Sequence, residues 1–132
     1  METNYYDYYS HNLNRNMPIK VYGHHGRPIL FIPCQDGRFF DFENFHLTDT
    51  FSHWIENGEV IVFAIDTIDR ETWSDTNGDG YWRIRKHEQW INYITREVVP
   101  FIREYVNEKN NWDGYPGIMT FGCSMGATHA LN

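Results

Sequence analysis

The sequence has few of the features that mark disulfide scaffolds, nucleic-acid binders or membrane-surface proteins. Only two cysteines, Cys34 and Cys123, occur among 132 residues. They are too few for a disulfide framework and lack the spacing of a metal site, so we expect two small buried side chains. Basic residues number 11 against 18 acidic ones, which gives a net charge of −7. This balance argues against nucleic acid or an anionic membrane as the main partner.

Long hydrophobic runs are also missing. No stretch approaches the roughly 20 apolar residues of a membrane span, and residues 1–5 have neither the basic start nor the apolar run of a signal peptide. The length fits one domain over residues 1–132, which we expect to be soluble and cytoplasmic. Aromatic residues are abundant instead, at 17% of the chain.

Apolar runs and turn residues predict strands that alternate with helices. Residues 5–10 and 17–22 are typical of an antiparallel hairpin, while 29–32 and 60–65 are continuous apolar runs, typical of strands covered on both faces. Helical spacing appears from Phe42 to Ile55, with Gly58 as a stop, and again from about Tyr81 to Lys109, with a bend or interruption near Pro100. We therefore predict an α/β fold in which an N-terminal hairpin is followed by parallel strands.

The most informative stretch is Gly122-Cys123-Ser124-Met125-Gly126, which matches G-x-S-x-G. An apolar stretch, 118–121, precedes it and a helix-compatible stretch, 126–131, follows it. This strand–turn–helix context is that of a nucleophile elbow, in which the glycines allow a tight turn that exposes the serine hydroxyl. The alternative is a glycine-rich turn whose serine only caps a helix.

An elbow also predicts an oxyanion hole. The first N–H donor would come from Met125, directly after the nucleophile, and the second from Cys34 or Gln35, in the loop after the apolar run 29–32. The other interpretation of Gln35-Asp36-Gly37 is a simple turn.

Metal sites have weaker support. His24 and His25 have no third ligand at a useful spacing, so a solvated turn is the simpler interpretation. Asp75, Asn77 and Asp79 imitate the first half of a calcium loop, D-x-N-x-D-G, but Lys86 stands at position twelve, where a bidentate glutamate is needed. We expect no metal and no cofactor.

Four blocks carry a family resemblance: 17–23, 65–73, 85–90 and 122–130. Together they resemble the "putative esterase" branch of the α/β-hydrolase superfamily, near the esterase D and feruloyl esterase type, and they match the N-terminal half of that family's domain. The resemblance implies a three-layer α/β-hydrolase-like sheet without its C-terminal strands. It also implies a small-molecule ester substrate, attack by Ser124 and an acyl-enzyme intermediate.

The resemblance leaves the catalytic triad incomplete. In α/β-hydrolases the acid and the histidine follow the serine, and only eight residues follow Ser124. His129 would point roughly 140° away from Ser124 on a helix, and Asp66 and Asp69 cannot activate a serine without a histidine. We therefore expect either a truncated hydrolase, or copies that assemble over the exposed sheet edge. The competing hypothesis is an inactive hydrolase-like domain that binds a partner through its edge and aromatic surface.

Overall fold

The computed structural model describes residues 2–33, 38–44, 46–66, 80–110 and 117–122. It begins with an antiparallel hairpin of strands β1 (Thr3–Ser10) and β2 (Arg15–Tyr22), paired from Thr3↔Tyr22 to Ser10↔Arg15. The turn between them includes Asn14 in a left-handed conformation, with φ 56°, which asparagine tolerates better than most residues. The predicted hairpin is thus confirmed.

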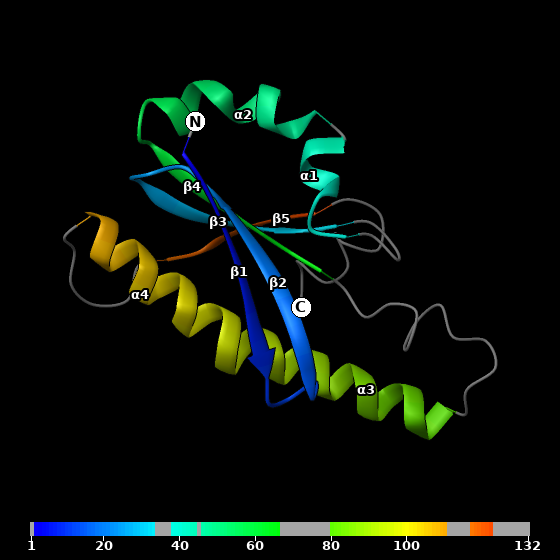
Figure 1. The fold of residues 1–132 in the computed structure, drawn as a ribbon. Helices are drawn as coiled ribbons and strands as arrows, with labels where there is room; N and C mark the ends of the chain where they lie inside the picture. The colour runs from blue at the N-terminus through cyan, green and yellow to red at the C-terminus, as the bar shows by residue number, and fades with distance from the viewer. Residues whose placement is uncertain (1, 34–37, 45, 67–79, 111–116, 123–132) are drawn as a thin grey trace.

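Strands β3 (Arg27–Ile32), β4 (Val60–Ile65) and β5 (Met119–Gly122) complete a five-stranded mixed sheet of order β1-β2-β4-β3-β5. Strand β4 pairs antiparallel with β2 and parallel with β3, and β3 pairs parallel with β5. The predicted α/β class is confirmed, with parallel strands after the hairpin (Figure 1).

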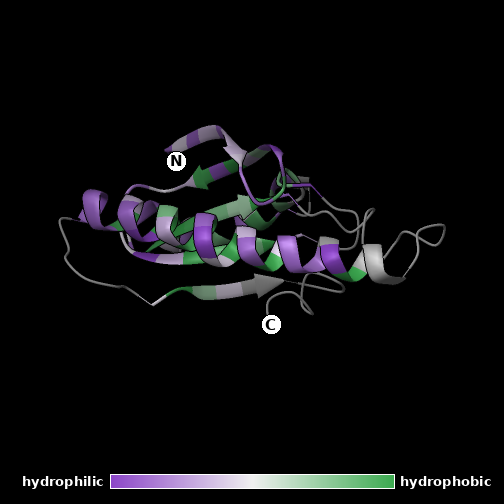
Figure 2. Cartoon of the chain, turned by 90° about the horizontal axis from the view of Figure 1, so that it is seen from below, coloured by the Kyte–Doolittle hydropathy of each residue, from purple (hydrophilic) through white to green (hydrophobic). Residues whose placement is uncertain are grey.

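Alternate residues of the central strands enter two separate hydrophobic clusters, as the period of two in a β-strand requires. Leu30 and Ile32 of β3 belong to the cluster that contains Trp90 and Ile102, whereas Ile29 and Phe31 belong to the cluster that contains Phe42 and Ile55. Helices therefore cover both faces of β3 and β4, which explains why these strands are apolar throughout. Figure 2 shows the central strands mostly green behind a long helix with a largely purple outer side.

The helical stretch that begins at Phe42 is divided in two, which corrects the single helix expected from its apolar spacing. Helix α1 (Asp41–Asn44) and helix α2 (Leu47–Glu56) are separated at His46, whose φ of 59° is left-handed. A left-handed residue cannot continue a right-handed helix. The predicted stop is confirmed, because Gly58 has φ 73° and its N–H donates to the carbonyl of Ile55.

The second helical stretch crosses the opposite face of the sheet as α3 (Gly80–Tyr93), the π-helical turn η2 (Ile94–Val98) and α4 (Val99–Asn110). In the π-helical turn the Val99 N–H donates to the carbonyl of Ile94, five residues back. The irregularity lies directly before Pro100, which has no N–H to continue the α-helical pattern. The predicted interruption near Pro100 is thus confirmed. In the parts of the chain that the structure describes, no helix combines the length and the apolar character needed to cross a bilayer.

The last residue of α4 holds the connection between β2 and β3. The side chain of Asn110 accepts a hydrogen bond from Gly26 N and donates one to Gly26 O, each of 2.8 Å, and it is buried. Gly26 has φ 120°, and a Cβ there would lie 2.2 Å from the carbonyl carbon of Glu59. The turn therefore requires glycine at position 26.

Candidate active site

Three parallel strands end together at one edge of the sheet. Phe31 of β3 pairs with Ala64 of β4, and Ile32 of β3 pairs with Gly122 of β5. The carboxyl ends of β3, β4 and β5 consequently lie on the same side of the sheet (Figure 1). In open α/β sheets ligands bind beyond the carboxyl ends of such strands.

The residues predicted to carry the chemistry follow two of these strand ends at equal distances along the chain. Cys34 and Ser124 are each the second residue after the Ile32↔Gly122 pair, and Gln35 and Met125 are each the third. All four lie outside the described residues, as do Asp69 and His129. The structure thus brings together the two strands that lead to these residues.

Asp66, which the sequence analysis placed at this edge, directly follows β4 and is buried. Its Oδ2 accepts a hydrogen bond of 2.8 Å from Arg38 Nε, and its Oδ1 accepts one of 2.7 Å from the Phe39 N–H. These contacts tie the end of β4 to the chain that leaves β3. Sequence reasoning missed both donors, which lie 28 and 27 residues from Asp66 along the chain.

A buried phenol lies near the same carboxylate. Burial raises the pKa of Tyr93 most strongly, and the negative charges of Glu97 and Asp66 raise this pKa further. Tyr93 therefore remains a protonated phenol at any physiological pH.

A second carboxylate joins the hairpin turn to the long helix. Glu97 Oε2 accepts hydrogen bonds from Ser10 Oγ and Asn12 Nδ2, each of 2.8 Å, and from Asn12 N at 3.2 Å. Burial alone would raise the pKa of Glu97, but the hydrogen bonds from Asn12, Ser10 and the His11 backbone outweigh it and hold the pKa below its ordinary value. Sequence reasoning missed this cluster, whose members are 85 to 87 residues apart.

Of the candidate metal ligands, the structure describes the two histidines but not the residues of the calcium-like loop. His25 Nδ1 lies 2.9 Å from the carbonyl oxygen of Gly58, a contact that joins the turn before β3 to the end of α2. Asp75, Asn77 and Asp79 lie outside the described residues. Among those the structure does describe, no three histidine, cysteine or acidic side chains gather closely enough to hold a metal ion.

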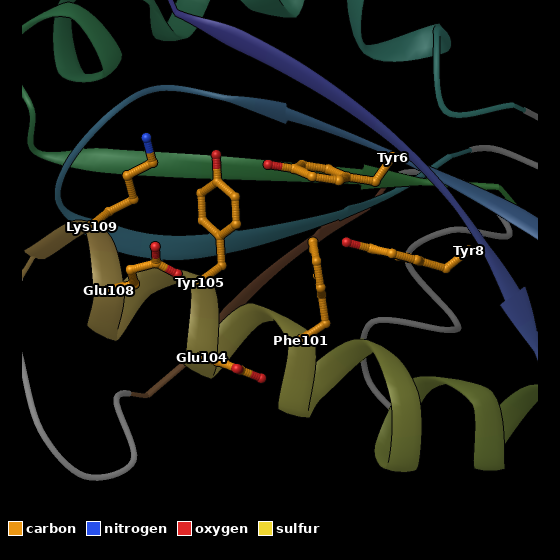
Figure 3. Close-up of a pocket in the computed structure, with 7 residues that line it drawn as sticks. All are labelled: Tyr6, Tyr8, Phe101, Glu104, Tyr105, Glu108 and Lys109. Atoms are coloured by element: carbon orange, nitrogen blue, oxygen red, sulfur yellow. The ribbon is translucent and has the colours of Figure 1, made fainter.

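An aromatic groove of about 400 Å³ lies between β1 and α4 (Figure 3). Four aromatic rings line it, together with two glutamates and a lysine: Tyr6, Tyr8, Phe101, Tyr105, Glu104, Glu108 and Lys109. The rings of Tyr6 and Phe101 meet edge to face with centroids 5.5 Å apart, and those of Tyr6 and Tyr105 do so at 5.9 Å. These edge-to-face contacts join β1 to α4.

Polar contacts also join the two sides of the groove. Lys109 Nζ is 5.8 Å from the centroid of the Tyr105 ring and 3.6 Å from Glu2 Oε1, and the Tyr105 hydroxyl accepts a hydrogen bond of 3.1 Å from Asn4 Nδ2. These contacts fasten β1, the outermost strand next to β2, onto α4. We interpret the groove as a packing joint, separate from the edge where the parallel strands end.

Comparisons with known proteins agree with this geometry. The family model described as "Putative esterase" matches residues 10–132. A search of curated proteins finds no match. Similar solved structures include a ferulic acid esterase, with a TM-score of 0.68 and 14% identity over 98% of this chain and 52% of that one. They also include the siderophore hydrolase EstB from Aspergillus nidulans, with a TM-score of 0.55 and 18% identity over 98% of this chain and 51% of that one.

A further similar structure is an IroE-like serine hydrolase from Shewanella oneidensis, with a TM-score of 0.54 and 15% identity over 83% of this chain and 40% of that one. At these identities the likeness is one of fold. The chain spans about half the length, or less, of these solved structures. Because the family model covers nearly the whole sequence, the chain belongs to the family described as "Putative esterase".

Proposed function

We propose that this chain carries the nucleophile and the oxyanion hole of a serine ester hydrolase that acts on small-molecule esters. Ser124 is the nucleophile, and the backbone N–H groups of Met125 and of Cys34 or Gln35 are the oxyanion donors. The observation that carries the proposal is the parallel pairing Ile32↔Gly122, because these residues follow its two strands at equal distances. Membership of an esterase family supports the same reaction.

The proposed reaction proceeds through an acyl-enzyme. Ser124 Oγ attacks the acyl carbon of the ester while its proton passes to a base, and the carbonyl oxygen becomes an oxyanion between the two N–H donors. Collapse of this intermediate breaks the bond to the alcohol, which leaves with a proton. Water then attacks the acyl-enzyme by the same steps in reverse order, which releases the acid and restores Ser124.

The proposed reaction also needs a general base and an acid that orients this base. In the family pattern both follow the nucleophile, and the similar ferulic acid esterase extends well beyond the part that this chain matches. We therefore propose that the chain forms the N-terminal half of a three-layer α/β-hydrolase-like domain, and that the base and acid belong to a further segment. Assembly of copies over the β5 edge is the alternative way to complete the sheet.

A fluorophosphonate probe tests the nucleophile. We expect slow phosphonylation of Ser124 in this chain, and faster phosphonylation when imidazole is added as an external base, since imidazole can accept the serine proton in place of the base that we assign to the further segment. Ser124→Ala should abolish labelling, whereas Ser52→Ala, at a helical serine of α2, should leave it unchanged. A folded protein that is not labelled at Ser124 even with imidazole would contradict the proposal and favour an inactive interaction domain.

A further inference from the structure

The buried carboxylate of Asp66 holds a neighbouring stretch of backbone in place at the candidate site. Its side chain is 11% exposed, while that of its partner Arg38 is 53% exposed. One carboxylate oxygen accepts from the Arg38 guanidinium and the other from a backbone N–H, at 2.8 and 2.7 Å. A buried carboxylate is costly unless charged or N–H donors surround it, and among the described residues Arg38 and its neighbour Phe39 supply one donor of each kind.

The held residues are also fixed by their side chains. The Phe39 ring packs against the cluster that contains Phe31 and Phe42, and its centroid lies 5.5 Å from that of Tyr5. The guanidinium carbon of Arg38 lies 5.5 Å from the centroid of the Phe40 ring. Residues 38–39 are therefore attached to the end of β4 by the carboxylate of Asp66, and to one face of the sheet by Phe39.

The segment before Arg38 also begins next to a buried residue of the sheet edge. Pro33 directly follows β3 and is buried, so residues 34–37 join two positions that are both held at the carboxyl edge of the sheet. Cys34 or Gln35 in this segment is the proposed second oxyanion donor. Such donors act only when they stand about 2.7–3.1 Å from the developing oxyanion.

We infer that Asp66 is a positioning residue that fixes the far end of the oxyanion segment, and that it is not the acid of the catalytic triad. The inference rests on the proposed esterase function. A triad acid stabilises a positively charged imidazolium, whereas the charge of Asp66 is already opposed by the guanidinium of Arg38. Both of its carboxylate oxygens accept hydrogen bonds from the chain after β3.

Two variants and one control test the inference. Asp66→Asn keeps the size of the side chain and removes its charge, and Arg38→Gln removes the ion pair while it keeps the Phe39 N–H bond. The control Asp49→Asn makes the same chemical change at a carboxylate of α2 that is 86% exposed. Thermal unfolding of each variant would establish the temperature range in which all four proteins are folded.

The first measurement does not depend on activity. We expect hydrogen exchange at the Phe39 amide to accelerate by about tenfold or more in Asp66→Asn, because the amide loses a charged acceptor. Trypsin should also cleave more rapidly after Arg38 in this variant. Arg38→Gln should accelerate exchange less, and Asp49→Asn not at all. Unchanged exchange at Phe39 in Asp66→Asn would overturn the inference.

The second measurement separates positioning from stability. With imidazole present, the limiting rate of Ser124 phosphonylation should fall by about 10- to 100-fold in Asp66→Asn, while the probe concentration at half-maximal rate stays the same. A limiting rate equal to that of the wild type would overturn the inference even if exchange at Phe39 increased. Failure of the wild type itself to react would instead refute the esterase proposal, and with it the inference that Asp66 positions an oxyanion donor.

Discussion

The Glu97 carboxylate provides a sharp test of how the hairpin is held to the long helix. Its Oε2 accepts three hydrogen bonds, from Ser10 Oγ, Asn12 Nδ2 and Asn12 N. Glu97→Gln keeps the shape but makes each bond neutral, and a bond to a charged group is stronger than a neutral one by about 1 kcal/mol. The three bonds share one oxygen and Glu97 is partly exposed, so we expect a loss of only about 1–2 kcal/mol in unfolding free energy at neutral pH.

The pH dependence of this loss follows from the lowered pKa of Glu97. A carboxyl group whose pKa is lower in the folded protein contributes stability that is fully present above its ordinary pKa of 4.5 and is lost as the pH falls through the folded pKa. Urea unfolding of wild type and Glu97→Gln should therefore show a difference at about pH 7 that shrinks at about pH 3.5. Glu104→Gln, at an exposed position of α4, should change stability by less than about 0.5 kcal/mol. A Glu97→Gln loss of equal size at both pH values would refute this reasoning.

Three further predictions concern the packing that supports the candidate site. Asn110→Ala leaves the Gly26 N–H and carbonyl buried without these partners and should cost about 2–4 kcal/mol in urea unfolding; a loss below about 0.5 kcal/mol would contradict it. Gly26→Ala should cost more than about 3 kcal/mol or prevent folding, because its Cβ meets the backbone of Glu59. Its control, Gly58→Ala, meets only side-chain atoms and should cost about 1 kcal/mol; equal losses would argue against a backbone clash. Phe101→Ala should cost about 2–4 kcal/mol and accelerate hydrogen exchange in β1 more than in β3, and uniform acceleration would contradict the packing joint.

Much of the fold could be predicted because the strands are bounded by local signals. The strand 60–65 was predicted with the bounds that the structure gives, since both of its faces are buried and polar or glycine residues flank it. The division at His46 could not be predicted in the same way. Apolar residues keep a helical spacing across the break, and the left-handed conformation of a histidine has no strong sequence signal.

The sequence predicts where the candidate site lies in the sheet, but it does not predict which side chains contact one another there. The end of a buried strand placed Asp66 at the correct edge, but its donors Arg38 and Phe39 lie 28 and 27 residues away along the chain. The partners of Glu97 are further still. Such pairs depend on how the helices and the hairpin pack, which hydrophobic spacing alone does not specify. The elbow at Ser124 stays a prediction, because it lies outside the described residues.

The order of strands in the sheet has a consequence for how the protein is assembled. Strand β5 lies beside β3, yet more than fifty residues separate it from β4, the strand before it in the chain. The intervening residues include α3, η2 and α4, so the pairing of β5 with β3 is a non-local contact that can form only after the edge of β3 has formed. We expect β5 to join late, so that a variant which weakens its pairing speeds unfolding more than it slows folding. The G-x-S-x-G motif at the end of β5 would then join the fold only after the other strands of the sheet have paired.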